Sequence, residues 1–198
     1  MKTAIFGGSF NPIHNGHIQL VNTFKDNLGL DRAIIIPAYV SPFKEKDNSV
    51  TPEQRLEMCR LAFEGNEKAE ISDIEIKRQG ASYTYRTLEE LSEKYEEDEF
   101  FLITGADMFM SVHTWMHPEI IFRLAVICTV PREGENIEAL HKQAEYLKEQ
   151  GAKTEILDIS VMTVSSTEIR RKIREGRRIS GLVPKAVENY IGKNKLYR

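Results

Sequence analysis

The stretch that decides the fold lies near the N-terminus, where residues 2–17 read KTAIFGGSFNPIHNGH. Its first part, Thr3–Phe6, is a short apolar run of the kind that forms a buried strand, and two glycines follow it. From Ile18 to Leu28 the apolar residues recur with helical spacing. The sequence therefore predicts a strand, a glycine turn and a helix in immediate succession.

A glycine turn that leads into a helix is suited to binding an anion. Glycines let backbone amides approach a ligand closely, and the helix start adds unpaired N–H groups and a partial positive charge. His14 and His17 are three residues apart, so a helix that begins near Asn15 places both imidazoles on one side of its first turn. We therefore predict that this segment binds a phosphate group.

The rest of the chain continues the alternation of short apolar runs with longer segments of helical period. This alternation predicts a doubly wound, mostly parallel, Rossmann-like α/β sheet with helices on both faces. The expected strands are Thr3–Phe6, Ala33–Ile36, Ala69–Ile71, Phe100–Thr104, Ala125–Thr129 and Thr154–Leu157. The expected helices are Gly16–Asn27, Pro52–Phe63, Tyr85–Tyr95, Met108–Val112, Ile137–Gln150, Ser166–Arg174 and Pro184–Ile191.

Length and composition limit the classes of protein that the chain can belong to. With 198 residues, of which 41% are hydrophobic and 29% charged, we expect one folded domain over residues 1–198. A net charge of −3 provides no general attraction for nucleic acid, so we expect small-molecule partners. Cys59 and Cys128 indicate neither a disulfide framework nor a zinc site. No signal peptide or membrane span is evident, which predicts a cytoplasmic protein and leaves homo-oligomerisation open.

A second candidate phosphate site lies near the C-terminus, between Val164 and Arg170. Ser165 and Glu168 have capping-box spacing, which predicts that a helix begins here with unpaired amides and hydroxyls at its start. The planar guanidinium of Arg170 can donate two hydrogen bonds to phosphate oxygens at once. We therefore expect Arg170 to hold phosphate together with the start of this helix.

A third candidate segment follows the expected strand Phe100–Thr104. Gly105 and Asp107 come directly after that strand, and Trp115, the only tryptophan, lies shortly beyond them. Ligands of doubly wound sheets bind at the ends of the strands, so this segment is a candidate part of the same site.

These motifs together resemble those of the HxGH nucleotidyltransferases, in the form found in nicotinate-nucleotide adenylyltransferases of NAD synthesis. Residues 8–17 match the pattern G-S-F-x-P-x-H-x-G-H, and residues 164–170 match I-S-S-T-x-I-R with a valine for the first isoleucine. The resemblance covers essentially the whole chain. It implies transfer of an adenylyl group from ATP to nicotinate mononucleotide, with Mg²⁺ accompanying the ATP and no metal held by the protein itself. It assigns the catalytic role to His14, His17 and Arg170.

The same resemblance assigns residues to the two substrates. ATP would be bound by Gly7, Gly8, Ser9, Phe10, Gly105, Asp107, Ser165, Ser166, Thr167 and Arg170. The mononucleotide would be bound by Lys44, Tyr83, Thr84, Trp115 and Arg132. Thr84 belongs to a segment similar to the family's S-Y-T, although a helix cap is an equally natural interpretation of its hydroxyl. Lys44 ends a loop similar to P-x-x-x-P-P-H-K, in which Phe43 stands where histidine is common.

The chemistry implied by these residues is direct transfer. A phosphate monoester has a second pKa near 6, so the acceptor is largely anionic at neutral pH and needs neither an enzymatic base nor a protein nucleophile. Other acceptors remain open, namely nicotinamide mononucleotide and phosphopantetheine, and so does a non-catalytic nucleotide sensor. A pocket of amide donors favours the nicotinate carboxylate over the carboxamide.

Overall fold

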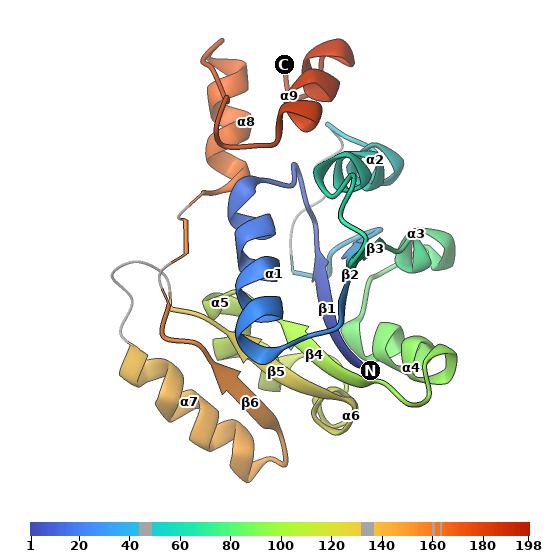
Figure 1. Cartoon of the computed structure of the whole chain (residues 1–198), viewed down its shortest axis with the longest axis vertical. Helices are drawn as coiled ribbons and strands as arrows, with labels where there is room; N and C mark the ends of the chain where they lie inside the picture. Colours follow the sequence, from blue (N-terminus) through green and yellow to red (C-terminus); the bar gives the residue numbers. More distant parts are fainter. Residues whose placement is uncertain (44–48, 132–136, 160, 163) are drawn as a thin grey trace.

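A parallel sheet forms the centre of the computed structural model, which describes residues 1–43, 49–131, 137–159, 161–162 and 164–198 (Figure 1). The six strands lie in the order β3-β2-β1-β4-β5-β6, and every neighbouring pair is parallel. The strands are β1 Lys2–Gly8, β2 Arg32–Pro37, β3 Ala69–Ile71, β4 Glu99–Ile103, β5 Ala125–Thr129 and β6 Lys153–Ile156. This is the doubly wound order, so the predicted Rossmann-like fold is confirmed.

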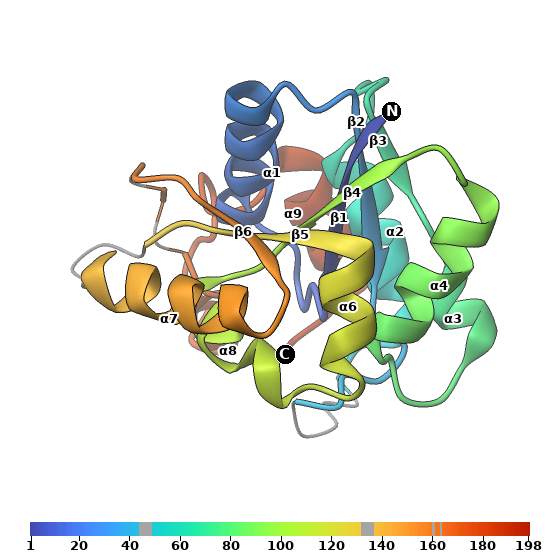
Figure 2. The same ribbon diagram turned by 90° about the horizontal axis from the view of Figure 1, so that it is seen from below.

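Helices cover both faces of the sheet (Figures 1 and 2). They are α1 Asn15–Leu28, α2 Pro52–Ala62, α3 Ile74–Arg78, α4 Thr84–Lys94, α5 Ala106–Ser111, α6 Pro118–Leu124, α7 Ile137–Glu149, α8 Ser166–Arg174 and α9 Lys185–Lys193, with a 3₁₀ turn, η1, at Val112–Thr114. Buried residues of α1, α2, α8 and α9 share one apolar cluster, and those of α4 to α7 share another. No helix within the described residues is both long enough and apolar enough to cross a lipid bilayer.

Successive residues of the inner strands contribute to opposite faces. Ala4 and Phe6 of β1 belong to the cluster under α1, whereas Ile5 belongs to the cluster under α4 to α7. In β2, Ile35 faces the first cluster and Ile34 the second. Because both faces are covered by helices, the central residues of these strands are all apolar, and Lys2, Thr3 and Arg32 lie at the strand starts.

The main differences from the sequence-based expectation are two short helices, α3 and α6. Each has fewer than eight residues, which is too short for a helical period to stand out in the sequence. The α5 helix also begins at Ala106, two residues before the expected Met108. All six strands were predicted at their observed places: β3 and β5 have the predicted bounds, and the bounds of the other four differ by one or two residues.

The winding of the chain reverses at β1, which lies between β2 and β4. Gly8 at the end of β1 is in register with Pro37 at the end of β2. The segments that follow β1, β2 and β4 therefore meet at one edge of the sheet. This edge is where open α/β sheets bind their ligands.

Candidate active site

The glycine turn after β1 has a fixed shape. A Cβ on Gly8 would lie 3.0 Å from two atoms of the Phe10 ring, so only glycine fits there without a shift. Phe10 has a φ of 43°, and its ring is buried at 2% exposure. That ring packs edge-on against Phe6 and His17, with centroid distances of 5.3 and 5.1 Å. Phe10 can therefore meet a ligand only through its backbone.

His14 and His17 lie together at the start of α1. His14 is the N-cap residue, and its Nδ1 accepts a hydrogen bond from the His17 backbone N–H at 3.3 Å. The His17 Nδ1 accepts from the His14 N–H at the same distance, and the rings stack at 3.5 Å. Because each Nδ1 is an acceptor, each Nε2 carries the hydrogen and is a donor. This arrangement suits two imidazoles that donate to one anion.

The start of α8 is bound to the turn that precedes α1, and so joins the two phosphate motifs. The Ser166 hydroxyl donates to the Pro12 carbonyl at 2.9 Å, and Arg170 Nη1 donates to the Asn11 carbonyl at 2.8 Å. A second Arg170 nitrogen, Nη2, lies 3.4 Å from Thr167 Oγ1. Segments more than 150 residues apart in the sequence thus form one site.

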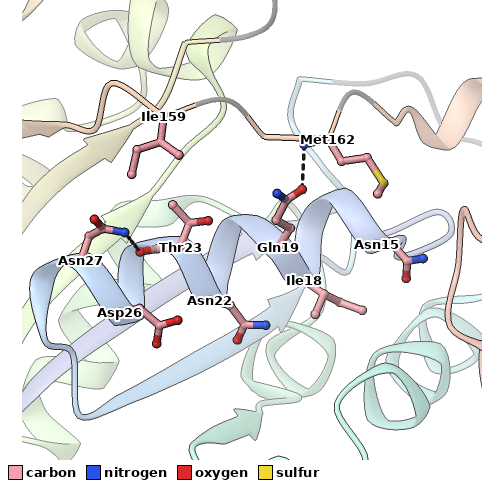
Figure 3. A pocket seen from close by; sticks show the side chains of 9 residues that line it. All are labelled: Asn15, Ile18, Gln19, Asn22, Thr23, Asp26, Asn27, Ile159 and Met162. Atoms are coloured by element: carbon pink, nitrogen blue, oxygen red, sulfur yellow. Dashed lines mark hydrogen bonds between the residues drawn. The ribbon is translucent and has the colours of Figure 1, made fainter.

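The chain before α8 also lies against α1. The Met162 N–H donates to Gln19 Oε1 at 2.7 Å across a cleft of about 550 Å³ along α1 (Figure 3). A Cβ on Gly16 would lie 3.0 Å from the Met162 carbonyl oxygen and 3.2 Å from His14 Nδ1. Glycine at position 16 therefore permits the close approach of the two segments.

The cap of α8 has only half of the expected capping box. Ser165 Oγ accepts from the Glu168 N–H at 3.1 Å, as predicted. The Glu168 carboxylate, however, pairs with Lys172 at 3.5 Å. Ser165 and Thr167 are exposed at this helix start, and Ser166 is half-buried.

The end of β4 lies beside the end of β1. Gly105 is the N-cap residue of α5, and Asp107 is exposed in the first turn of that helix. Thr104 is held by its N–H and its hydroxyl, which donate to the Cys128 carbonyl at 2.9 and 3.0 Å. The structure therefore brings Gly105 to the same edge of the sheet as the glycine turn.

Residues expected at the mononucleotide gather around the loop that follows β2. The Tyr39 N–H donates to Ser82 Oγ at 2.9 Å, and the Ser82 N–H donates to the Val40 carbonyl at 2.9 Å. These bonds attach the S-Y-T segment to the loop. The Phe43 ring of the same loop lies 5.0 Å from the Trp115 ring, which is 9% exposed.

Thr84 and its neighbours begin α4. Thr84 is the first residue of the helix, and the N-cap residue is Tyr83, whose side chain makes no cap hydrogen bond. The interpretation of Thr84 as a helix cap is therefore wrong, because the cap position falls one residue earlier. Lys44 and Arg132 lie outside the described residues.

Comparison with known proteins identifies the family. A model of the cytidylyltransferase-like family matches residues 5–172. The chain belongs to this family. A protein of Clostridium tetani, named probable nicotinate-nucleotide adenylyltransferase, is 38% identical over the whole chain and 99% of its own length. A protein of the same name from Clostridium acetobutylicum is 40% identical, over 99% of this chain and 98% of that protein. The predicted family is thus confirmed.

Solved structures agree in fold. The nicotinic acid mononucleotide adenylyltransferase of Plasmodium falciparum, complexed with NaAD, superimposes with a TM-score of 0.79 at 18% identity, covering 100% of this chain and 98% of that one. The same enzyme complexed with APC gives 0.78, over 99% and 96%. At this identity the likeness concerns the fold, and it agrees with the doubly wound sheet of this cytidylyltransferase-like chain.

Two residues at the site of this family member, Arg55 and Tyr197, were not singled out from the sequence. Arg55 of α2 donates to the Ser9 carbonyl at 2.7 Å and to the Tyr39 carbonyl at 3.0 Å. The Tyr197 hydroxyl donates to Asn11 Oδ1 at 2.7 Å, so the C-terminal segment contacts the turn before α1. The signal for Arg55 was present, since it lies four residues before Cys59 on the buried side of a predicted helix.

Burial shapes the electrostatics around these loops. Desolvation lowers the pKa of the Arg55 guanidinium. Desolvation raises the pKa of Glu75, against hydrogen bonds from Thr87 and Ser82 that lower it. Among the described residues, no three or more His, Cys, Asp or Glu side chains are grouped so that they could hold a metal ion. The groups around the glycine turn are mainly amides, imidazoles and guanidinium groups, which suit an anion.

Proposed function

We propose that the chain transfers the adenylyl group of ATP to nicotinate mononucleotide, forming deamido-NAD and pyrophosphate in NAD biosynthesis. The observation that carries the proposal is the junction of α1 and α8. Ser166 and Arg170 bind the carbonyls of Pro12 and Asn11, two and three residues before the His14 cap. The N-termini of α1 and α8 and the imidazoles of His14 and His17 therefore lie close together, and such a group of donors suits a polyphosphate. The relatives' names identify the reaction.

ATP would lie across the ends of β1 and β4. The backbone of Gly7, Gly8, Ser9 and Phe10 would contact its phosphates, and Gly105 and Asp107 its ribose. The start of α8, with Ser165, Ser166, Thr167 and Arg170, would hold the β- and γ-phosphates. The hydrogen bond of Arg170 to Asn11 supports this role, because it holds the guanidinium at the turn before α1.

The mononucleotide would lie beside the loop after β2. Trp115 would stack on the pyridine ring, and the backbone amide of Thr84 would donate to the nicotinate carboxylate, with Tyr83 beside it. The attachment of this segment to the loop through Ser82 supports a shared pocket. Lys44 and Arg132 would contribute positive charge to the mononucleotide phosphate.

The chemical step would be a direct displacement. An oxygen of the mononucleotide phosphate attacks the α-phosphorus of ATP, a new P–O bond forms, and the bond to the β-phosphate bridging oxygen breaks. The Nε2–H groups of His14 and His17 donate to the charge that develops in the transition state. Pyrophosphate leaves beside Arg170. No proton needs to be removed from the acceptor, because its phosphate is already anionic.

Mg²⁺ would enter with the nucleotide. The donors around the glycine turn are N–H groups rather than carboxylates, and the described residues provide no cage of three ligands. This set fits a cation that is held mainly by the phosphates of ATP. When bound, Mg²⁺ supplies charge neutralisation on the polyphosphate.

The test is a turnover assay with parallel acceptors. Purified protein is incubated with ATP, Mg²⁺ and nicotinate mononucleotide, nicotinamide mononucleotide or phosphopantetheine, while pyrophosphate and the dinucleotide product are measured. We expect a strong preference for nicotinate mononucleotide. Preference for another acceptor would overturn the assigned pocket, and ATP binding without turnover would favour a nucleotide sensor.

A further inference from the structure

A buried arginine lies behind the glycine turn. Arg55 of α2 is 7% exposed, and its guanidinium donates from Nη1 to the Ser9 carbonyl and from Nη2 to the Tyr39 carbonyl. Ser9 follows β1 and Tyr39 follows β2, so one side chain connects the ends of two neighbouring strands. These are the loops between which the two substrates would meet.

The charge of Arg55 has no carboxylate in direct contact among the described residues, although Glu53 and Glu75 act on it from farther away. Within the described residues, no Asp or Glu lies at ion-pair distance from its guanidinium, and both of its hydrogen bonds go to neutral carbonyls. Arginine remains protonated in proteins, so the cation is buried without an ion pair, and desolvation is the largest influence on its pKa. Such burial is unfavourable, because desolvation of an ion is repaid in full only by an opposite charge. An anionic substrate at this edge of the sheet would provide that charge.

The Ser9–Phe10 peptide connects the cation to the other side of the turn. This peptide is trans, so the Phe10 N–H points away from the carbonyl that Arg55 binds. Within the part of the chain that the structure describes, the Phe10 N–H has no hydrogen-bond acceptor. A hydrogen bond from a cation to the carbonyl polarises the peptide and strengthens its N–H as a donor.

The conformation of this peptide is held from both sides. Phe10 has a positive φ of 43°, which is unfavourable for a residue with a side chain and persists where the surroundings fix it. The buried Phe10 ring fixes one side of the peptide, and Arg55 fixes the Ser9 carbonyl on the other. Such strain is characteristic of functional sites.

The second hydrogen bond of Arg55 extends this support toward the mononucleotide pocket. The Tyr39 residue is held at both ends, by Arg55 at its carbonyl and by Ser82 Oγ at its N–H. Ser82 in turn hydrogen-bonds to the buried Glu75 carboxylate. Arg55 is therefore the link between the glycine turn and the segment that precedes α4.

We infer that Arg55 is a positioning residue for nucleotide phosphate: its guanidinium orients and polarises the Ser9–Phe10 peptide, so that the Phe10 N–H donates to a phosphate oxygen of ATP. The inference rests on the proposed function for the identity of the nucleotide. It assigns Arg55 no contact with the substrate and no step in the bond exchange. Arg55 instead raises the affinity for phosphate and fixes the distance between the loops that follow β1 and β2.

The experiment measures ATP affinity separately from stability. Arg55→Met removes the charge and both hydrogen bonds at similar side-chain length. Arg55→Lys keeps the charge but lacks the planar guanidinium that makes both hydrogen bonds. The control is Met58→Ala, which opens a cavity at a fully buried position of the same helix. The dissociation constant of ATP is measured by calorimetry without acceptor, well below each unfolding temperature, and kcat and KM are measured with both substrates.

We expect Arg55→Met to weaken ATP binding by about 10- to 100-fold. Arg55→Lys should fall between it and the wild type, and Met58→Ala should bind ATP within about twofold of the wild type while it unfolds at a lower temperature. ATP affinity unchanged in Arg55→Met, or lost equally in Met58→Ala, would show that Arg55 only stabilises α2. If Arg55→Met does not fold, the ATP affinities of Arg55→Lys and Met58→Ala are compared instead. Weaker ATP binding by Arg55→Lys would support the role, and equal binding would overturn it.

The two proposals fail in different ways. If the wild type forms deamido-NAD and the Arg55 variants bind ATP as it does, the role of Arg55 is overturned and the proposed function stands. If the wild type binds ATP but transfers its adenylyl group to none of the acceptors, the proposed function falls, and the ATP affinities of the variants still decide the role of Arg55. A wild type that binds no ATP overturns both.

Discussion

Because α1 lies so close to the segment before α8, we predict that one added methyl group at position 16 lowers activity without lowering stability. Gly16→Ala would place a Cβ 3.0 Å from the Met162 carbonyl oxygen and 3.2 Å from His14 Nδ1. Ordinary contact begins at 3.4 Å, so the Met162 segment or the His14 ring must move by about 0.4 Å. His14 belongs to the proposed phosphate site, and Met162 lies in the segment that leads into α8, so the movement should alter the geometry of catalysis.

The magnitude follows from the size of this displacement. A misplacement of 1 Å can lower a rate by about 100-fold, so a displacement of 0.4 Å should lower kcat/KM by about five- to tenfold. Stability should change little, since alanine favours the helix by about 1 kcal/mol over glycine while the contact costs about the same. Activity should thus fall while the free energy of unfolding stays within about 1 kcal/mol of the wild type.

A matched control is available in another helix. Gly192 of α9 has no heavy atom within 4 Å of its would-be Cβ, so Gly192→Ala should raise stability by up to about 1 kcal/mol without any effect on kcat/KM. Steady-state kinetics and urea unfolding of both variants make the comparison. A Gly16→Ala enzyme with kcat/KM within twofold of the wild type would refute the claim that this contact sets the site geometry.

Three further substitutions test other parts of the molecule. His17→Ala should lower kcat by roughly 100- to 1,000-fold, because it removes one donor to the developing charge, and near-normal turnover would exclude that role. Trp115→Leu should raise the KM for nicotinate mononucleotide by about tenfold and leave the KM for ATP unchanged, and equal effects on both would contradict stacking on the pyridine. Burial alone would raise the pKa of Asp98, but hydrogen bonds from Thr3, Arg32 and the N-terminal ammonium lower it to about 2. The ionised form of Asp98 should therefore contribute about 2 kcal/mol above pH 4, lost as the pH falls from 4 toward 2. In urea unfolding between pH 2 and 7, the stability deficit of Asp98→Asn should shrink toward low pH, and a constant deficit would contradict this linkage.

The strands and the two helix starts at which we predict phosphate binding could be predicted because their signals are local. Ile34 to Ile36 form a short apolar run whatever lies beside them, and glycine followed by a helix start is typical of anion binding. The helices α3 and α6 could not be predicted, because they are short and are held by packing at the face shared with α4. The residue before α6, His117, even has a positive φ of 51°, which no local pattern indicates.

The hydrogen bonds of the candidate site could not be predicted from the sequence for a different reason. Arg55 lies on the same side of α2 as Cys59, which marks it as a charged residue on a buried face. Its partners, however, are the backbone carbonyls of Ser9 and Tyr39, and a carbonyl is present at every residue. A sequence can show that a buried cation needs acceptors, but only the fold shows which ones it finds.

Backbone carbonyls also accept hydrogen bonds from side chains elsewhere around the proposed phosphate site. The carbonyls of Ser9, Asn11 and Pro12 each accept a hydrogen bond from a side chain of another helix, α2 in the first case and α8 in the other two. A reaction that needs no protein nucleophile depends on where donors are placed, and in the proposed site many of those donors would be backbone amides. Side chains that hold the carbonyl side of a turn also fix the direction of its N–H groups. Residues that never touch a substrate should therefore control its affinity, and a search for catalytic groups limited to direct contacts would miss them.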